Sequence, residues 1–248
     1  MEKETDFLFT KHIRCTVCGE TFETRVIKSG SLRRLEPDFD LRPRFRYVDA
    51  LKYEVYSCPH CGYSAMSRYF ENLTKIQKDL IRENIGSRFQ PTSTKAPETI
   101  DYKTAILRFK LALHNSEVKR AKLSEKAYIC LKIAWLYNSY MEELPENTEE
   151  ERAQKSALKQ TKDQFYQKAF EAFKETVATE DFPICGMDTH TMDYLLAALA
   201  CHFKEYAFAS KAVSNILTSQ TADRRIKDKA LDLKTEIVEG IKKENQNV

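Results

Sequence analysis

The chain has 248 residues, enough for one large domain or two smaller ones. Its 42% hydrophobic and 31% charged residues, with only six glycines, are typical of an ordinary soluble protein rich in helix. The formal charge of +3, from 40 basic and 37 acidic residues, favours no particular class of partner. The excess positive charge lies in residues 1–90, which hold 16 basic and 13 acidic side chains.

Two copies of a Cys-x-x-Cys-Gly motif lie in the first third of the chain, at residues 15–19 and 58–62. Each motif holds two sulfurs on one side of a metal, and two motifs complete a tetrahedron with metal–sulfur distances of about 2.3 Å. Four thiolates leave no open coordination position. The sequence therefore predicts a structural zinc site, with iron as the alternative metal, whose ligands are Cys15, Cys18, Cys58 and Cys61.

Short strands are predicted around these motifs. Apolar residues alternate with charged ones in residues 20–29, a turn follows, and a second extended stretch precedes another strand at residues 51–57. Antiparallel strands joined by two such motifs form a zinc-ribbon-like β unit, which we expect to span residues 1–70.

Three arginines, Arg42, Arg44 and Arg46, recur at every second residue between the two motifs. On a strand this spacing places all three guanidinium groups on one face, a candidate basic surface for the phosphates of nucleic acid. The alternative is a solvated strand edge, which Pro43 would suit, neutralised by nearby aspartates. Those aspartates are Asp38, Asp40 and Asp49.

From residue 70 the apolar period becomes helical. Leu73, Ile76, Leu80, Ile81 and Ile85 lie on one face of a helix predicted over residues 72–85 and ended by a glycine. The following residues, 91–99, contain two prolines and lack large apolar side chains, so a loop is expected there.

The remainder, residues 71–248, is predicted to form a helical domain that contains a repeat. An aromatic residue is followed by a small residue three positions later and a large apolar residue four positions after that. This is the pattern of the second helix of a tetratricopeptide-type hairpin, in which the small residue lets the preceding helix approach closely. The three copies contain Tyr102 with Ala105, Tyr166 with Ala169, and Tyr206 with Ala209.

Two features connect this repeat to its surroundings. A capping box of Thr148 and Glu151 predicts that an insert at residues 142–162 lengthens the second helix of the middle copy. The helix at 72–85 takes the place of the missing first helix of the first copy, so the ribbon and the helical domain are expected to share it. The predicted fold class is α+β, mainly α: a zinc-ribbon-like β unit followed by an irregular tetratricopeptide-like array of helical hairpins.

An enzyme is the least favoured interpretation. Cys185, Asp188, His190 and Asp193 lie close together in sequence, but Asp188 is more simply a helix N-cap, and a nucleophile pair of Cys185 with His190 has weak support. The chain lacks a Gly-rich phosphate loop and a His-x-x-x-His pair. Cys130 and Cys201 fall in apolar helical patterns, where they are expected to be free thiols that fill the core.

Several features occur together: two Cys-x-x-Cys-Gly motifs flanking a long basic insert, the sequence Cys-Pro-His-Cys-Gly-Tyr at 58–63, Ile-Ala-Trp-Leu-Tyr at 133–137 and Tyr-Leu-Leu at 194–196. In this combination the chain resembles the bacterial domain-of-unknown-function family 2225 over most of its length. The resemblance implies a bacterial, cytoplasmic zinc-ribbon protein with tetratricopeptide-like helices. It implies no activity, because the family has no assigned reaction.

We therefore expect a non-enzymatic, zinc-stabilised adaptor that binds a protein or peptide, and alternatively a nucleic-acid-binding module that uses the basic insert. The polar, acidic start of the chain and its short apolar runs predict a cytoplasmic protein without a membrane segment. In a repeat array the first helices line the concave face, so exposed side chains at 124–140 and 187–202 are the expected contacts of a protein partner.

Overall fold

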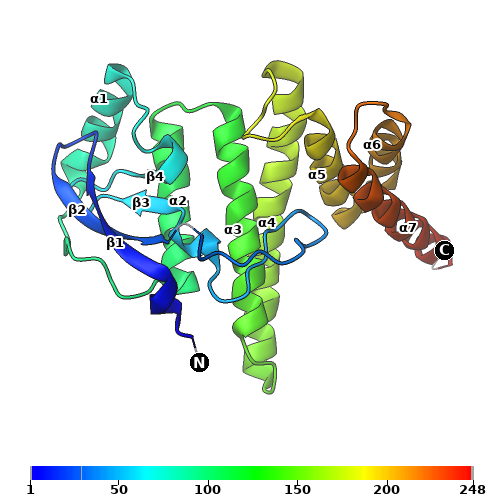
Figure 1. Ribbon diagram of the computed structural model, residues 1–248, viewed down its shortest axis with the longest axis horizontal. Coiled ribbons are helices and arrows are strands. Elements are labelled where there is room, and N and C mark those ends of the chain that lie inside the picture. The colour runs from blue at the N-terminus through cyan, green and yellow to red at the C-terminus, as the bar shows by residue number, and fades with distance from the viewer. Residues whose placement is uncertain (1, 29, 247–248) are drawn as a thin grey trace. The chain divides into compact units, whose positions relative to one another are not determined.

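The computed structural model describes residues 2–28 and 30–246, and its internal contacts divide the chain into two units (Figure 1). Unit 1 comprises Met1–Leu35 and Arg44–Ala169, and unit 2 comprises Glu36–Pro43 and Phe170–Val248. The chain thus passes from one unit to the other three times. This division differs from the expected break after residue 70, because the β-strands and the first helices belong to one unit.

Two antiparallel hairpins form the β part of unit 1. β1 (Leu8–Arg14) pairs with β2 (Thr21–Ile27), and β3 (Val55–Ser57) pairs with β4 (Ser64–Met66). Each hairpin carries one Cys-x-x-Cys-Gly motif in its turn. The strand predicted at 20–29 is confirmed, whereas the first half of the one predicted at 51–57 is a 3-10 helix that begins after an Asp49 cap.

The insert between the hairpins runs as a loop rather than as the predicted extended strands. Residues 31–48 contain a bridge between Arg34 and Phe45 but no regular ladder, although all of them are described. Asp38 and Leu41 form a tight turn in which Leu41 has a φ of 65°. A residue in this left-handed conformation interrupts the extended backbone that a strand needs.

The first helix, α1 (Lys75–Asn84), begins with a capping box of Thr74 and Gln77. Its Ile81 is fully buried and packs in the same cluster as Phe22 and Phe70 of the β part, so the helix shares the core of the ribbon as expected. Ile76 is 73% exposed, which contradicts its predicted place on the buried face.

Three longer helices complete unit 1 (Figure 1). The predicted loop at 91–99 is present and leads into α2. In α3, every residue from 124 to 140 is buried or half-buried. The Thr148–Glu151 capping box opens α4, which confirms that the insert lengthens this helix. The helices are α2 (Tyr102–Val118), α3 (Leu123–Glu143) and α4 (Glu149–Thr179), whose last ten residues belong to unit 2.

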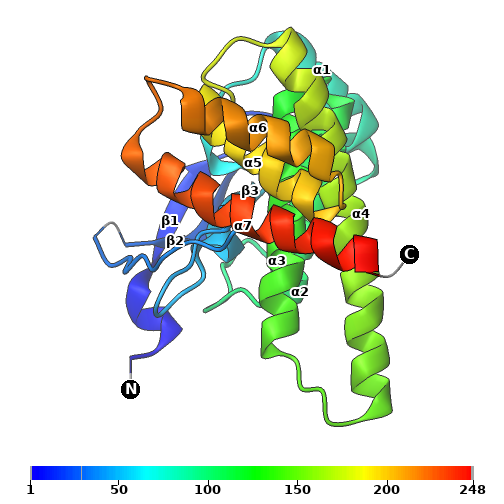
Figure 2. The same cartoon turned by 90° about the vertical axis from the view of Figure 1, so that its right-hand side faces the viewer.

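Unit 2 also contains α5, α6 and α7, which lie side by side in Figure 2. The short segment Glu36–Pro43 belongs to it, because the Tyr194 hydroxyl of α5 donates to the Phe39 carbonyl at 2.9 Å and Lys229 of α7 pairs with Glu36 at 2.7 Å. Part of the insert between the two cysteine motifs is therefore a structural element of this unit. The helices are α5 (Thr189–His202), α6 (Tyr206–Thr218) and α7 (Arg224–Gln246).

The small residues of the predicted repeat, Ala105, Ala169 and Ala209, are completely buried. We expect Ala209→Leu to destabilise unit 2 by about 1–3 kcal/mol, because three added carbons overpack a filled position. Ala207→Leu, at an exposed position of the same helix, is the control and should leave the melting temperature unchanged. Equal melting temperatures for Ala209→Leu and the wild type would contradict the close packing assigned to this alanine.

Candidate metal centre

The two cysteine motifs have the same backbone geometry. Gly19 and Gly62 have φ values of 85° and 75°, and their N–H groups donate to the carbonyls of Cys15 and Cys58 at 2.9 and 3.0 Å. A positive φ of this size favours glycine, which explains the residue that ends each motif. Each turn is closed by a second bond, from Cys15 N–H to the Glu20 carbonyl and from Cys58 N–H to the Tyr63 carbonyl, both 2.8 Å long.

The sulfurs of Cys15, Cys18, Cys58 and Cys61 all lie within 4.8 Å of one another. The sulfurs of Cys15 and Cys61 are 3.7 Å apart, as are those of Cys18 and Cys58. A tetrahedron with metal–sulfur bonds of about 2.3 Å has edges of about 3.8 Å, so these spacings match a four-thiolate centre. The four cysteines can hold a metal ion. His60, inside the second motif, is not part of the cluster; its Nε2 lies 3.4 Å from the Thr21 carbonyl.

Hydrogen bonds with other residues of unit 1 hold the first motif in place. The Arg82 guanidinium of α1 donates to the Val17 carbonyl at 2.7 and 2.9 Å, and the Thr16 hydroxyl donates to the Phe70 carbonyl at 3.1 Å. Cys15 is 1% exposed, whereas Cys18 is exposed. The motif is thus fixed by α1 and by the residues before it, and presents one thiol at the surface.

The second motif is enclosed more tightly. A side chain at Gly62 would place its Cβ against the Phe89 ring, closer than van der Waals contact allows, so the position favours glycine for space as well as for backbone conformation. Asn115 of α2 donates from its amide to the Leu111 carbonyl at 2.9 Å and to the Gly62 carbonyl at 3.4 Å. The Thr92 N–H binds the Pro59 carbonyl at 2.9 Å, so the predicted loop packs against this motif.

The thiols influence one another's ionisation. Hydrogen bonds with Cys58 and Cys61 lower the pKa of Cys15, while hydrogen bonds with Cys15 and Cys58, together with burial, raise the pKa of Cys61. One thiolate held among thiols resists the formation of a second, because like charges repel at this distance. A bound cation removes this conflict and allows all four sulfurs to act as anionic ligands.

Comparison with known protein families matches residues 8–237 to a family described as an uncharacterized protein conserved in bacteria, DUF2225. The chain belongs to the DUF2225 family. The match includes both cysteine motifs and extends through most of α7, so it covers both units of this DUF2225 member. Neither the curated proteins nor the solved structures contain a match to it. Within its described residues, no helix combines the length and the apolar character needed to cross a membrane.

The candidate basic surface does not form as predicted in the DUF2225 chain. Arg42 is 1% exposed and forms an ion pair with Asp38, so it cannot contribute to a surface. Arg44 forms a double hydrogen bond with Glu142 at 2.6 and 2.9 Å. Arg46 lies over the ring of Tyr47 at 5.3 Å. The spacing of the three arginines by two residues predicts one shared face on a strand. The backbone here is a loop, and the three side chains lie in separate environments.

The structure gives the Cys185 region a structural role. Asp188 caps α5 by accepting a hydrogen bond from the Thr191 N–H at 2.7 Å, as expected. His190 Nε2 lies 2.9 Å from the Ser219 hydroxyl, a contact between the start of α5 and the end of α6. Burial raises the pKa of Asp193.

Cys130 is 5% exposed and its pKa is raised to about 11 by burial, which fits a thiol that fills the core.

The predicted concave lining is wrong in one respect. All of residues 124–140 are buried or half-buried, and within 187–202 only Asp188, Thr189 and His202 are exposed, so these stretches supply mostly core rather than exposed contacts. The exposed apolar side chains lie elsewhere, with Leu107 and Leu111 on α2 at 57% and 37% exposure. The sequence analysis did not single out Leu107, because its helix was identified by the repeat pattern and the other apolar residues of that helix fit this pattern.

Proposed function

We propose that this chain is a non-enzymatic adaptor, stabilised by one zinc ion, that binds a segment of another protein. Cys15, Cys18, Cys58 and Cys61 would hold the zinc, and four thiolates would leave no position for substrate. Free thiols such as Cys130 suit a reducing compartment such as the cytoplasm, which we include in the proposal. Iron is the alternative metal, and elemental analysis separates the two.

The observation that carries the adaptor proposal is an open groove formed by α2, α3 and α4. It has a volume of about 280 Å³, and its apolar wall includes the exposed Leu107 of α2 and half-buried Leu158 of α4. Exposed apolar side chains beside a groove are typical of a protein-binding surface. Its full lining is Lys103, Ile106, Leu107, Lys110, Tyr137, Tyr140, Gln154 and Leu158.

The charges and rings of this groove indicate the chemistry of its partner. Lys103 and Lys110 are seven residues apart on α2, about two helical turns, and so lie on the same face of the helix. Lys110 Nζ lies 5.4 Å from the centre of the Tyr137 ring and 5.8 Å from that of the Phe165 ring. Aromatic and apolar side chains bordered by lysines complement a peptide that alternates apolar and acidic residues. We therefore commit to an acidic, amphipathic segment of a protein as the occupant.

Nucleic acid is the weaker alternative, because the arginine face that motivated it does not form. Phosphate contacts weaken steeply as salt concentration rises, while apolar contacts in a groove do not. A salt titration of any binding therefore distinguishes the two. Retention that is lost at high salt and after nuclease treatment would favour the nucleic-acid alternative.

Selection from a displayed library of random peptides tests the groove. We expect enriched peptides to combine leucine or phenylalanine with glutamate or aspartate, and Leu107→Glu to weaken their binding about tenfold or more. Leu231→Glu is the matched control, since Leu231 is a 51% exposed leucine on α7 of unit 2. Peptides that bind wild type and Leu107→Glu equally, or no enrichment at all, would contradict the proposal.

A further inference from the structure

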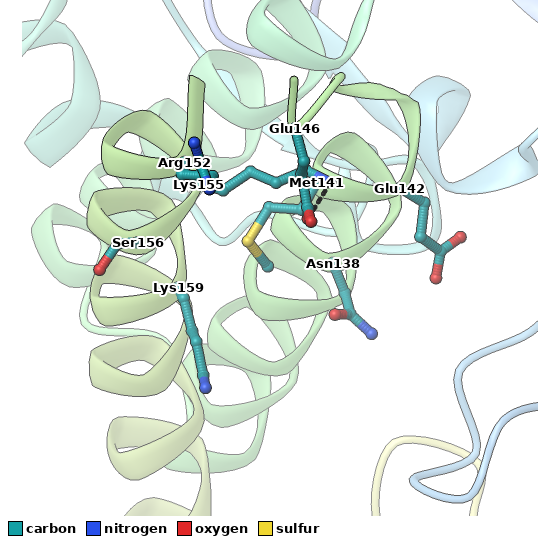
Figure 3. Close-up of a pocket in the computed structure, with 8 residues that line it drawn as sticks. All are labelled: Asn138, Met141, Glu142, Glu146, Arg152, Lys155, Ser156 and Lys159. Carbon is teal, nitrogen blue, oxygen red and sulfur yellow. Dashed lines mark hydrogen bonds and ion pairs between the residues drawn. The ribbon is translucent and has the colours of Figure 1, made fainter. Parts of the chain in front are cut away.

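A second pocket lies in unit 1, between the end of α3 and the first turns of α4 (Figure 3). Its volume of about 480 Å³ is within the range of small-molecule sites. None of its residues lines the groove described above, so it is a separate site. Its lining is Asn138, Met141, Glu142, Glu146, Arg152, Lys155, Ser156 and Lys159.

The wall formed by α4 is basic. Arg152, Lys155 and Lys159 are spaced by three and four residues, which places their side chains on one face of the helix. Arg152 and Lys159 are about 10 Å apart along the helix axis, at a rise of about 1.5 Å per residue. Opposite them α3 contributes Met141 and the amide of Asn138, seen in the centre of Figure 3.

The two carboxylates of the pocket are already engaged. Glu142 points away from the other lining side chains in Figure 3 and holds Arg44 through both of its oxygens. Glu146 forms an ion pair with Lys155, marked by the dashed line in Figure 3. Within residues 2–28 and 30–246, neither Arg152 nor Lys159 has a carboxylate within ion-pair distance; the Arg152 Nε donates to the Thr148 carbonyl at 3.2 Å.

We propose that this pocket binds a small organic molecule with two anionic groups, one held by Arg152 and the other by Lys159. The planar guanidinium suits a carboxylate or phosphate, and the ammonium supplies a second, mobile donor. The Asn138 amide offers a neutral hydrogen bond between the two ends, and the Met141 side chain contacts the apolar middle of the ligand. Lys155, paired with Glu146, keeps that carboxylate from repelling the ligand.

Isothermal titration of the full, metal-loaded chain tests this site with two probes, suberate and fructose 1,6-bisphosphate, and with glucose as the neutral control. We expect at least one of these two probes, each of which has two anionic groups, to bind and glucose not to bind. The preferred probe assigns the anionic group as carboxylate or phosphate. The variant R152Q/K159Q should bind about tenfold or more weakly, because it loses two charged donors.

The control K234Q/K242Q removes the same charge from exposed positions on α7 and should bind like the wild type. The substituted side chains of both double variants lie at the surface. The circular dichroism spectra of the two variants and the wild type should therefore be the same. Absence of binding by both probes, or equal weakening in the two double variants, would overturn the proposal.

Discussion

Cys58→Ser is expected to abolish metal binding and to unfold the β part of unit 1. Cys58 is 1% exposed, its sulfur lies 3.7 Å from that of Cys18, and a hydroxyl is a poor replacement for a thiolate ligand. Structural zinc contributes about 10–16 kcal/mol in small zinc-binding peptides, which is as much as the whole stability of an ordinary domain. The metal content should fall from one ion per chain to nearly none.

Elemental analysis measures the metal, and hydrogen exchange at the amides of β1 to β4 measures the folding of the hairpins. Cys201→Ser is the matched control, because Cys201 is a half-buried cysteine on α5 of unit 2 and lies outside the sulfur cluster. It should retain the metal and the protection of the hairpins. Unchanged metal content in Cys58→Ser would show that the four sulfurs do not form the binding site.

Lys119→Met should destabilise unit 1 by about 3–5 kcal/mol, the second-largest effect that we expect. Lys119 Nζ lies 2.7 Å from the Glu125 carboxylate, with side-chain exposures of 3% and 11%. Removing the ammonium leaves a nearly buried carboxylate without its counter-ion. Trp135, buried on α3 and the single tryptophan of the sequence, reports unfolding of unit 1 by fluorescence in urea.

Two further variants distinguish the effect of losing the Lys119–Glu125 ion pair from the effect of losing any lysine. Lys122→Met changes an exposed lysine at the start of α3 and should leave the urea midpoint unchanged. The double variant K119M/E125M removes both charges and should recover part of the lost stability, since a buried ion pair is replaceable by apolar groups. A midpoint for Lys119→Met equal to that of the wild type would mean that the pair contributes no stability.

Local features of the sequence were enough to predict the cysteine cluster, the helix near residues 72–85 and the capped starts of α4 and α5. Motif spacing determines the sulfur positions, and the capping residues Asp188 and Thr148 act on backbone groups within three residues. Predictions failed where distant contacts decide the result. The alternation of Arg42, Arg44 and Arg46 is compatible with a strand, but the buried Arg42 lies in a short segment of unit 2, and the rest of that unit begins more than a hundred positions later.

The sequence pattern also did not predict that a whole helix is buried. The α3 sequence has apolar residues on several faces, which the repeat interpretation assigned to an exposed concave surface. Periodicity identifies a buried face but does not say how many neighbours a helix has. The exposure of Ile76 is the converse case, an apolar side chain in the correct phase that no neighbouring element covers.

The segment Glu36–Pro43 also affects the order in which a newly made chain can mature. It leaves the ribosome about 130 residues before the first residues of α4 that belong to unit 2, and about 150 before Tyr194, to which Phe39 is bonded. Unit 2 therefore cannot acquire its complete set of contacts until an early segment and the last helices meet. Closing a loop of this length is slow compared with forming a local hairpin. A chain made only as far as the end of α2 contains every residue described above as holding the two motifs, so it should form metal-binding hairpins with this segment still undocked.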